Sequence, residues 1–406
     1  MRISTIQIFQ RGISSIQDVT AQQQKTQEQL ATGKRVLTPA DDPVASTRIL
    51  ELNQEIAINT QFQRNVELAE GRLAIQDDRL GGVSDVIERI RTLAIASGNG
   101  ALTKDDLGSI ASEIEQRLDQ LAGLLNARDA GGEYVFSGFQ GGIVPFQKND
   151  SGSYRYQGDE GVRFVQVESS VRIQSTLNGH ELFEDTPAYT NTFFTEAGAA
   201  NQSDPPAIIT VGQVVDQELY DAFYPEDMVI EFTSATTFDI REKSSGLVLQ
   251  SNVTYTPNAP ITEQGAQFEI RGAPVAGDTF LVESSEKQGL LRTVEKFVYG
   301  LRNYAPTPEG RDSFENLLES TIANLDSSMT SVLDARGQLG ARLNTLETGL
   351  EQLKDAEILT QEALVQLESV DYAEAISLLS LQQFSLDAAY SSFNRITSLS
   401  LFDRIG

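Results

Sequence analysis

The side chains that most often carry catalysis or bind metal ions are nearly absent from this sequence. It has no cysteine, no tryptophan and a single histidine, His180. This removes thiol nucleophiles, disulfides and most zinc or histidine-dependent chemistry. Carboxylate, serine, lysine and tyrosine chemistry remains, but no serine occupies a Gly-x-Ser-x-Gly elbow, and the Gly131-Gly132 pair is typical of a turn. We therefore expect no enzyme, no cofactor and no catalytic residues, and we expect His180 to be a loop residue.

The charge of the chain excludes further classes of partner. Its 406 residues include 58 acidic and 31 basic ones, a net charge of -27. Binding nucleic acid or an anionic membrane requires a basic face, so we expect neither as a partner. Residues 181–240 hold twelve acidic residues and neither lysine nor arginine, which predicts a solvated anionic surface. Calcium binding is the alternative there, but an aspartate-rich loop with regular ligand spacing is lacking, so no metal is predicted.

The first residues do not resemble a cleavable signal peptide. Met1 to Ile6 interleave polar and apolar residues without the continuous apolar core that such a signal needs. The sequence also lacks a run of about 18 to 20 apolar residues, the length of a membrane-spanning helix. On composition alone the chain would be placed in the cytosol.

The N-terminal third of the sequence has the periodicity of long helices. Spacings of three and four residues over 6–30 predict an amphipathic helix that ends near Gly33, with an apolar start and polar positions at Thr20, Gln23 and Gln27. Asp42 and Pro43 then predict the N-cap and first residue of a second long helix. Its seam, meaning the apolar positions that face a partner helix, contains Leu52, Val66, Leu73, Leu80 and Ile87. A further helix follows over 103–125, capped by Thr103.

The middle of the chain favours strands and turns. β-Branched and aromatic residues gather between glycine-rich segments, which predicts strands at 134–136, 153–156, 163–167, 171–173, 228–232, 267–270 and 279–282. We expect a separate β-rich domain at 181–285.

Helical periodicity returns after the β-rich region. A short amphipathic helix is predicted over 290–301, followed by a run from Ile322 to Leu367 that is longer than a solitary globular helix usually is. The seam of this run contains Leu339, Leu346, Leu353 and Leu367. A last helical segment extends over 372–393.

Pairing these stripes predicts the architecture. An apolar stripe must meet another one, so the N- and C-terminal helices should form a coiled-coil rod with a β-rich outer domain inserted between them, a mainly α fold. The expected segments are a terminal helix at 1–40, rod and hairpins at 41–180, the outer domain at 181–285, rod at 286–370 and a second terminal helix at 371–406. Because polar residues interrupt the stripes near both chain ends, we expect the two terminal helices to be disordered in the monomer and to pack against neighbouring subunits.

Several short segments closely resemble the hook-associated protein 3 family of the bacterial flagellum, which belongs to the flagellin-like superfamily. They are residues 1–5, 29–36, 38–45, 132–138, 145–146, 272–280 and 398–403. Flagellins share a looser version of the opening. The Leu401-Phe402-Asp403 ending separates the chain from flagellins and from hook-associated protein 1, whose C-terminal signatures look different.

The resemblance implies a structural junction subunit for filament assembly and motility. Its expected partners are hook-associated protein 1, flagellin, copies of itself in a ring, and a cytoplasmic export chaperone on the C-terminal helices. The resemblance also implies an extracellular location in the flagellum and export by the flagellar type III apparatus without cleavage. The expected subunit interface contains Ile6, Phe9, Ile13, Ile16, Lys34, Arg35, Asp41, Asp42, Leu386, Phe393, Leu399, Leu401 and Phe402.

Other interpretations of the same residues stay open at this point. Lys34 and Arg35 compensate the dipole at a helix C-terminus in the simpler interpretation, and Asp41 and Asp42 only start a helix. Flagellin itself, a filament subunit, is the nearest alternative function. A secreted coiled-coil adhesin is the alternative from outside the flagellum.

Overall fold

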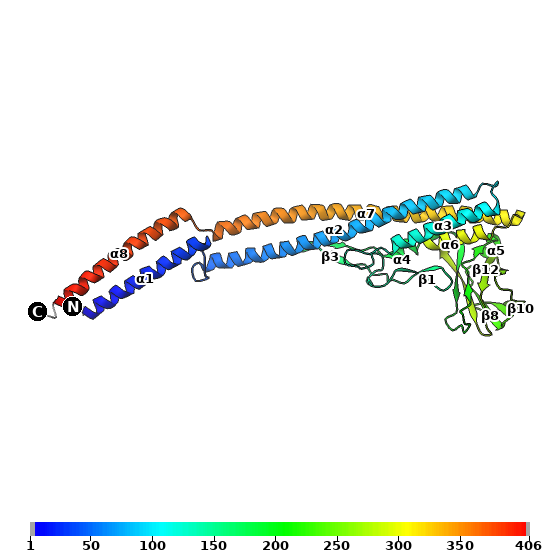
Figure 1. Ribbon diagram of the computed structural model, residues 1–406, viewed down its shortest axis with the longest axis horizontal. Helices are drawn as coiled ribbons and strands as arrows, with labels where there is room; N and C mark the ends of the chain where they lie inside the picture. The colour runs from blue at the N-terminus through cyan, green and yellow to red at the C-terminus, as the bar shows by residue number, and fades with distance from the viewer. Residues whose placement is uncertain (1–4, 403–406) are drawn as a thin grey trace. The chain divides into compact units, whose positions relative to one another are not determined.

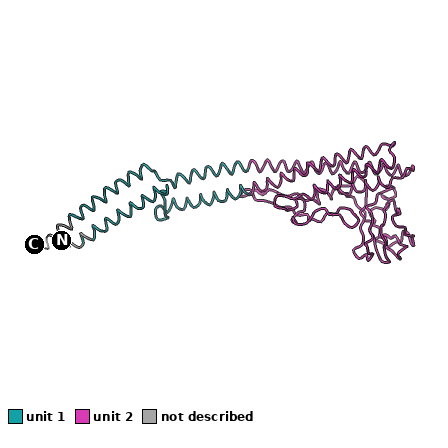
Figure 2. Tube along the Cα trace, in the orientation of Figure 1, with its two compact units in different colours: residues 1–64, 349–406 teal, residues 65–348 magenta. Residues whose placement is uncertain are grey.

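The computed structural model describes residues 5–402, with the side chains of residues 5, 6, 8, 9 and 396–402 left undescribed. The chain divides into two compact units (Figure 2). The first unit comprises residues 1–64 and 349–406, and the second comprises residues 65–348. Two long helices, α2 (Pro43–Ser97) and α7 (Pro308–Glu368), contribute residues to both units.

The first unit is built from paired helices. Helix α1 (Thr5–Thr32) lies beside α8 (Tyr372–Phe402), so the two ends of the described chain lie together (Figure 1). The two helices approach closely at Gly12, where an added β carbon would lie 3.2 Å from the Phe393 ring. The portions of α2 and α7 in this unit are joined by a hydrogen bond of 2.6 Å from Gln63 Nε2 to Glu357 Oε2.

The boundary between α1 and α2 follows the predicted capping chemistry. Gly33 adopts a φ of +72°, a conformation that side chains with a β carbon disfavour, and α1 ends directly before it. Helix α2 begins at Pro43, and Asp42 Oδ1 accepts a hydrogen bond of 3.0 Å from the amide of Ala45. The helix boundaries predicted at Gly33 and Asp42 are thus confirmed.

Helices also frame the second unit. The portions of α2 and α7 in this unit are linked by ion pairs from Arg91 to Asp326 at 2.7 Å and from Arg336 to Asp77 at 2.9 Å. Helix α3 (Lys104–Leu125) starts with a capping box of Thr103 and Asp106 and packs against α6 (Leu290–Arg302). Every residue of α6 from 290 to 301 is buried, so this helix is the centre of the unit.

Two small hairpins follow α3 in the chain. Strand β1 (Phe146–Lys148) pairs with β2 (Tyr154–Tyr156), and β3 (Phe164–Gln166) pairs with β4 (Arg172–Gln174). A one-turn helix, α4 (Gly179–Phe183), comes next. It carries His180, which lies in a helix and not in the predicted loop, because Asn178 caps this turn by accepting from the His180 amide at 2.9 Å.

The remaining strands form two antiparallel sheets. A five-stranded sheet has the order β10-β9-β8-β13-β5. Its strands are β5 (Pro187–Ala197), β8 (Met228–Ser234), β9 (Thr237–Glu242), β10 (Val248–Thr254) and β13 (Thr279–Lys287). A smaller sheet contains β6 (Ile208–Ile209), β7 (Gln213–Val214), β11 (Pro260–Glu263) and β12 (Ala266–Arg271). The short helix α5 (Gln217–Phe223) contacts β5. Between the sheets lies an aromatic core that includes Phe193, Tyr220, Phe232, Phe238, Phe268 and Phe280.

The predicted fold class is confirmed, since a β-rich insertion separates N- and C-terminal helices. The strand predicted at 134–136 is wrong: only Tyr134 pairs, in an isolated bridge with Arg128, because Gly132 and Gly138 turn the chain with positive φ. The division into five predicted segments stays a prediction. The disorder predicted for the terminal helices in the monomer stays a prediction.

Candidate subunit interface

The linkers that follow α1 and α7 pair with one another inside the first unit. The amide of Arg35 donates to the carbonyl of Glu368 at 2.6 Å, and the amide of Val370 donates to the carbonyl of Gly33 at 2.9 Å. Lys34 and Ser369 thereby form a one-residue antiparallel bridge. The break between α1 and α2 thus lies beside the break between α7 and α8, and backbone hydrogen bonds join the two linkers.

Charged side chains reinforce this linker pairing. Lys34 pairs with Glu368, and Arg35 donates to the carbonyl of Leu367 at 3.1 Å and pairs with Asp42 at 3.4 Å. Arg35 therefore neutralises carbonyls at the C-terminus of α7, whereas the sequence suggested compensation at the end of its own preceding helix. A basic side chain does lie at a helix C-terminus, but the helix is α7 and not α1.

The two aspartates of the linker have separate roles. Asp41 pairs with Lys25 at 2.5 Å and accepts from the amides of Thr38 at 2.9 Å and Leu37 at 3.1 Å. The hydrogen bond from Lys25, followed by those from the amides, lowers the pKa of Asp41 to about 2. The pKa of Asp42 is lowered chiefly by its hydrogen bond from the Ala45 amide. Lys34, Arg35, Asp41 and Asp42 thus all have partners within this chain, and any contact they make with another subunit stays a prediction.

The predicted interface residues on the terminal helices divide into two groups. Leu386 and Phe393 are half-buried, and Phe393 covers Gly12 of α1. Ile13 is 39% exposed and Ile16 is half-buried. The predicted interface side chains that lie outside the described residues are Ile6, Phe9, Leu399, Leu401 and Phe402, and the motif segments at 1–4 and 403 lie outside them as well.

Helix α8 exposes a second set of apolar side chains that the sequence reading did not assign to an interface. They are Tyr372, Ile376, Leu378, Leu381, Phe384 and Tyr390, each at least 44% exposed. At 100° per residue these positions are spread around the helix, outside the stripe of Ala375, Gln382 and Phe393 that turns toward α1. Residues 372–402 include only three charged side chains, Glu374, Asp387 and Arg395. A long helix with so few charged side chains is normally covered by other elements, so this composition was the available signal.

The predicted seam positions lie in the interior of their units. In the first unit Leu52 and Leu353 are buried, whereas Leu367, next to the linker, is only half-buried. The second unit buries the other seam residues: Val66, Leu73, Leu80, Ile87, Leu339 and Leu346. These leucines and β-branched residues therefore stabilise each unit from within.

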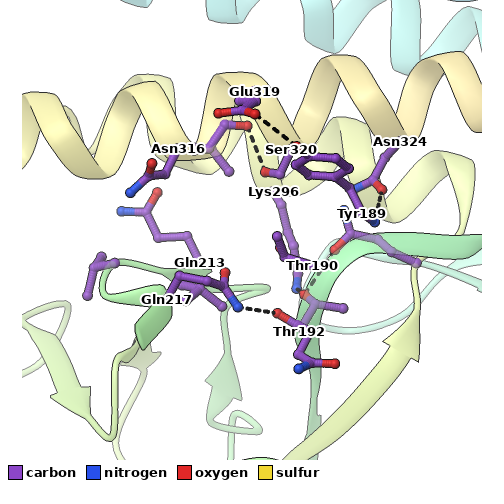
Figure 3. A pocket seen from close by; sticks show the side chains of 15 residues that line it. Tyr189, Thr190, Thr192, Gln213, Gln217, Lys296, Asn316, Glu319, Ser320 and Asn324 are labelled. Atoms are coloured by element: carbon purple, nitrogen blue, oxygen red, sulfur yellow. Dashed lines mark hydrogen bonds between the residues drawn. The ribbon is translucent and has the colours of Figure 1, made fainter. Parts of the chain in front are cut away.

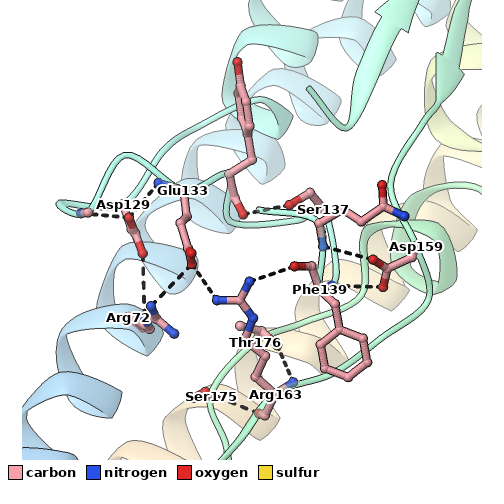
Figure 4. A network of polar contacts seen from close by, with 12 residues as sticks. Arg72, Asp129, Glu133, Ser137, Phe139, Asp159, Arg163, Ser175 and Thr176 are labelled. Atoms are coloured by element: carbon pink, nitrogen blue, oxygen red, sulfur yellow. Dashed lines mark hydrogen bonds and ion pairs between the residues drawn. The ribbon is translucent and has the colours of Figure 1, made fainter. Parts of the chain in front are cut away.

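The family-like segment 132–138 is held by a polar network in the second unit (Figure 4). Glu133 accepts from Arg163 at 2.5 Å and pairs with Arg72 of α2 at 3.4 Å, while Arg72 also pairs with Asp129 at 3.6 Å. These contacts attach the loop after α3 to α2. The motif thus has a structural explanation within the chain.

The same loop is also held by hydrogen bonds to the side chain of Asp159. Asp159 accepts from the amides of Phe139 and Gln140, both at 2.9 Å, and from the amide of Gly161 at 2.7 Å. The pKa of Asp159 is lowered by these backbone hydrogen bonds, against the opposing effect of burial. Gly138 allows the approach because its φ of +74° favours glycine.

The described residues offer little for metal or membrane chemistry. Over the part of the chain that the structure describes, no three His, Cys, Asp or Glu side chains are grouped as metal ligands would be. No helix within residues 5–402 combines the length and apolar character needed to cross a membrane. What the first unit does present is the set of exposed apolar side chains on α8.

Known proteins are similar to this chain at its two ends and, in some cases, over its full length. The model of the bacterial flagellin N-terminal helical region matches residues 3–140, and that of the flagellin C-terminal helical region matches residues 322–403. Flagellar hook-associated protein 3 of Salmonella typhimurium is 26% identical over 405 residues, which cover 99% of each chain. The crystal structure of the Legionella pneumophila flagellar hook-associated protein 3 is 25% identical, with a TM-score of 0.54 over 79% of this chain and 98% of that one.

Filament proteins are similar to a much smaller part of this chain. The flagellar filament 41 kDa core protein of Borreliella burgdorferi is 35% identical over 97 residues, only 24% of this chain and 29% of its own. The similarity to filament proteins is thus local, whereas the similarity to the hook-associated proteins extends through the β-rich insertion. Its terminal helical regions and this full-length similarity show that the chain belongs to the flagellar hook-associated protein 3 family.

Proposed function

We propose that this chain is the structural adaptor at the hook–filament junction of the bacterial flagellum. In this proposal copies of the chain form a ring that contacts hook-associated protein 1 on one side and the first flagellin subunits on the other. The observation that carries the proposal is the surface of α8, which exposes six large apolar side chains outside the stripe that turns toward α1. Family membership supports the same role, because the relatives are named for their association with the hook.

The energetics of α8 favour burial by other chains. Removing a large apolar side chain from water contributes about 1.5–3 kcal/mol. Six such side chains are exposed on α8, and Phe384 is 73% exposed. Exposed apolar side chains in this number on one helix favour a protein interaction site. The helix pair α1 and α8 would therefore complete its packing when neighbouring subunits cover it.

The same surface requires cover before assembly. We propose that a cytoplasmic chaperone binds the C-terminal helices and that the chain leaves through the flagellar type III apparatus without losing its N-terminus, to act outside the cell. The exposed apolar residues of α8 support a chaperone, since an uncovered surface of this type promotes aggregation.

A structural role, and not a catalytic one, completes the proposal. The relatives are structural flagellar proteins, and the sequence has no cysteine and one histidine. Some of the described acidic residues pair with nearby basic side chains or cap helices, as Glu133 and Asp42 do.

The adaptor role can be tested by changing only the exposed face of α8. We would introduce Leu381→Asp with Phe384→Asp into a strain whose chromosomal copy is deleted, and count filaments by electron microscopy. Because both side chains are exposed, the purified variant should fold as the wild type does, whereas the cells should lose their filaments. The matched control is Leu247→Asp, which places the same charge at an exposed leucine in the turn before β10.

The test separates this role from the filament role. If the variant cells carry normal filaments, α8 does not form the subunit contact that we propose. If the purified wild-type chain polymerises into long filaments by itself and is abundant in sheared flagella, the chain acts as a flagellin.

A further inference from the structure

A small polar cavity lies in the second unit where β5, α5, α6 and α7 meet (Figure 3). Its volume of about 120 Å³ is several times that of one water molecule, for which about 30 Å³ is typical. Its wall contains the carboxylate of Glu319 and six carboxamide side chains: Asn191, Gln213, Gln217, Gln288, Asn316 and Asn324. Amide groups can donate hydrogen bonds to a bound ion, so the wall is suited to a small polar guest.

Lys296 of α6 is the exceptional group in this wall. Only 3% of its surface is exposed, and its Nζ donates to the hydroxyl of Thr192 and to the carbonyl of Phe193, the latter at 2.8 Å. The nitrogen also lies 4.5 Å from the centre of the Phe193 ring. Figure 3 shows the side chain reaching toward Thr190 and Thr192 of β5. Within the described residues, these neutral groups hold the amine and no carboxylate pairs with it.

The charges around the amine leave it short of a counter-charge. On its own helix the charge that acts on it is that of Arg292, a second buried cation, which is paired at 3.6 Å with Glu295. From β5 the titratable group in the cavity wall is Tyr189, and its hydroxyl donates at 2.9 Å to Glu319 of α7, which lies in the same wall. From α5 they are Tyr220, which donates to the carbonyl of Thr192 at 2.7 Å, and Asp221, which accepts from Asn191 and Gln217, each at 2.9 Å.

These neighbours do not compensate a positive charge on Lys296. Burial, and then the charge of Arg292, hold its pKa well below the ordinary lysine range. A buried ammonium group of this kind is costly unless an anion accompanies it.

We propose that this cavity is a binding site for a small monovalent anion of halide size, with Lys296 as its cationic ligand and the carboxamide side chains as further donors. The bound anion would supply the missing counter-charge and would join β5 to α6 and α7. The proposal concerns the second unit alone and does not depend on the junction role.

Bromide is a suitable probe because it is halide-sized and scatters anomalously. Crystals of the full chain soaked in sodium bromide should show an anomalous peak within hydrogen-bonding distance of Lys296 Nζ. In solution, bromide at constant ionic strength should raise the melting temperature relative to gluconate, which is too large for the cavity. A rise of about 1–3 °C is expected at a concentration tenfold above the dissociation constant.

Substitutions and pH distinguish the site from general salt effects. Lys296→Met should abolish the bromide-dependent rise, whereas Lys104→Met, at an exposed lysine of α3, should keep it. Because the amine must be protonated to pair with the anion, the affinity of the wild type should fall about tenfold per pH unit above the pKa of the amine. Equal melting in bromide and gluconate, a pH-independent effect, or bromide peaks only at surface sites would each overturn the proposal. The crystal experiment uses the wild-type chain and stays decisive if the Met variant fails to fold.

Discussion

The assignment of the α7 seam can be tested by comparing two leucines of one helix. Leu346 is 1% exposed and Leu333 is 52% exposed, and both lie in the part of α7 that belongs to the second unit. Truncating a leucine to alanine removes three carbon atoms, and each buried methylene contributes about 0.8 kcal/mol. The cavity that remains adds to this loss, so Leu346→Ala should lower the free energy of unfolding by about 2–5 kcal/mol.

Leu333→Ala removes the same atoms from a surface that stays in water. It should change the free energy of unfolding by no more than about 0.5 kcal/mol. The assay is urea denaturation followed by circular dichroism at helix wavelengths, with the dependence on urea concentration checked to be equal in both variants and the wild type. If the two variants unfold at the same urea concentration, Leu346 does not occupy the seam and the helix pairing described for the second unit is incorrect.

Three further predictions concern single groups and the chain ends. Burial raises the pKa of Glu184 to about 7 from an ordinary 4.5, so the folded wild type should lose about 3 kcal/mol of stability as pH rises from below 4.5 to above 7. Glu184→Gln should remove this pH dependence, which thermal melting at each pH would measure. Parallel curves of stability against pH for the wild type and the variant would contradict this. Asp42→Ala should destabilise the start of α2, visible as faster amide hydrogen exchange at residues 44–46, whereas Asp42→Asn should keep most of the cap; equal exchange in both variants would argue against capping. Gentle proteolysis of the isolated chain should remove about 40 N-terminal and about 30 C-terminal residues while the rest resists, and resistance from end to end would show that the α1 and α8 pair is stable alone.

Helix positions were predictable because their signals are local. Gly33 and Asp42-Pro43 mark a helix end and a helix start by backbone preference alone, and the structure places both boundaries there. The strand at 134–136 was mispredicted because its aromatic and β-branched residues serve a different purpose. Phe136 is fully buried in a turn, where its ring packs edge-on against Phe183, so burial and not pairing explains the composition.

The candidate interface was harder to predict because it depends on contacts across the chain. Arg35 and Asp42 are seven residues apart, but the partner of Arg35 in α7, Leu367, is 332 residues away. No spacing rule connects such positions. The burial of Lys296 could not be predicted either, because its neighbours on β5 come from a segment, 187–197, in which no strand was predicted. Only α8 carried a readable signal, in its scarcity of charged residues.

The most direct test of the junction role is electron microscopy of cells from which the gene has been deleted. A junction protein should leave hooks without filaments when it is missing, together with unpolymerised flagellin in the medium, and filaments should return when the wild-type gene is restored. Normal filaments on the deletion cells would contradict the junction role.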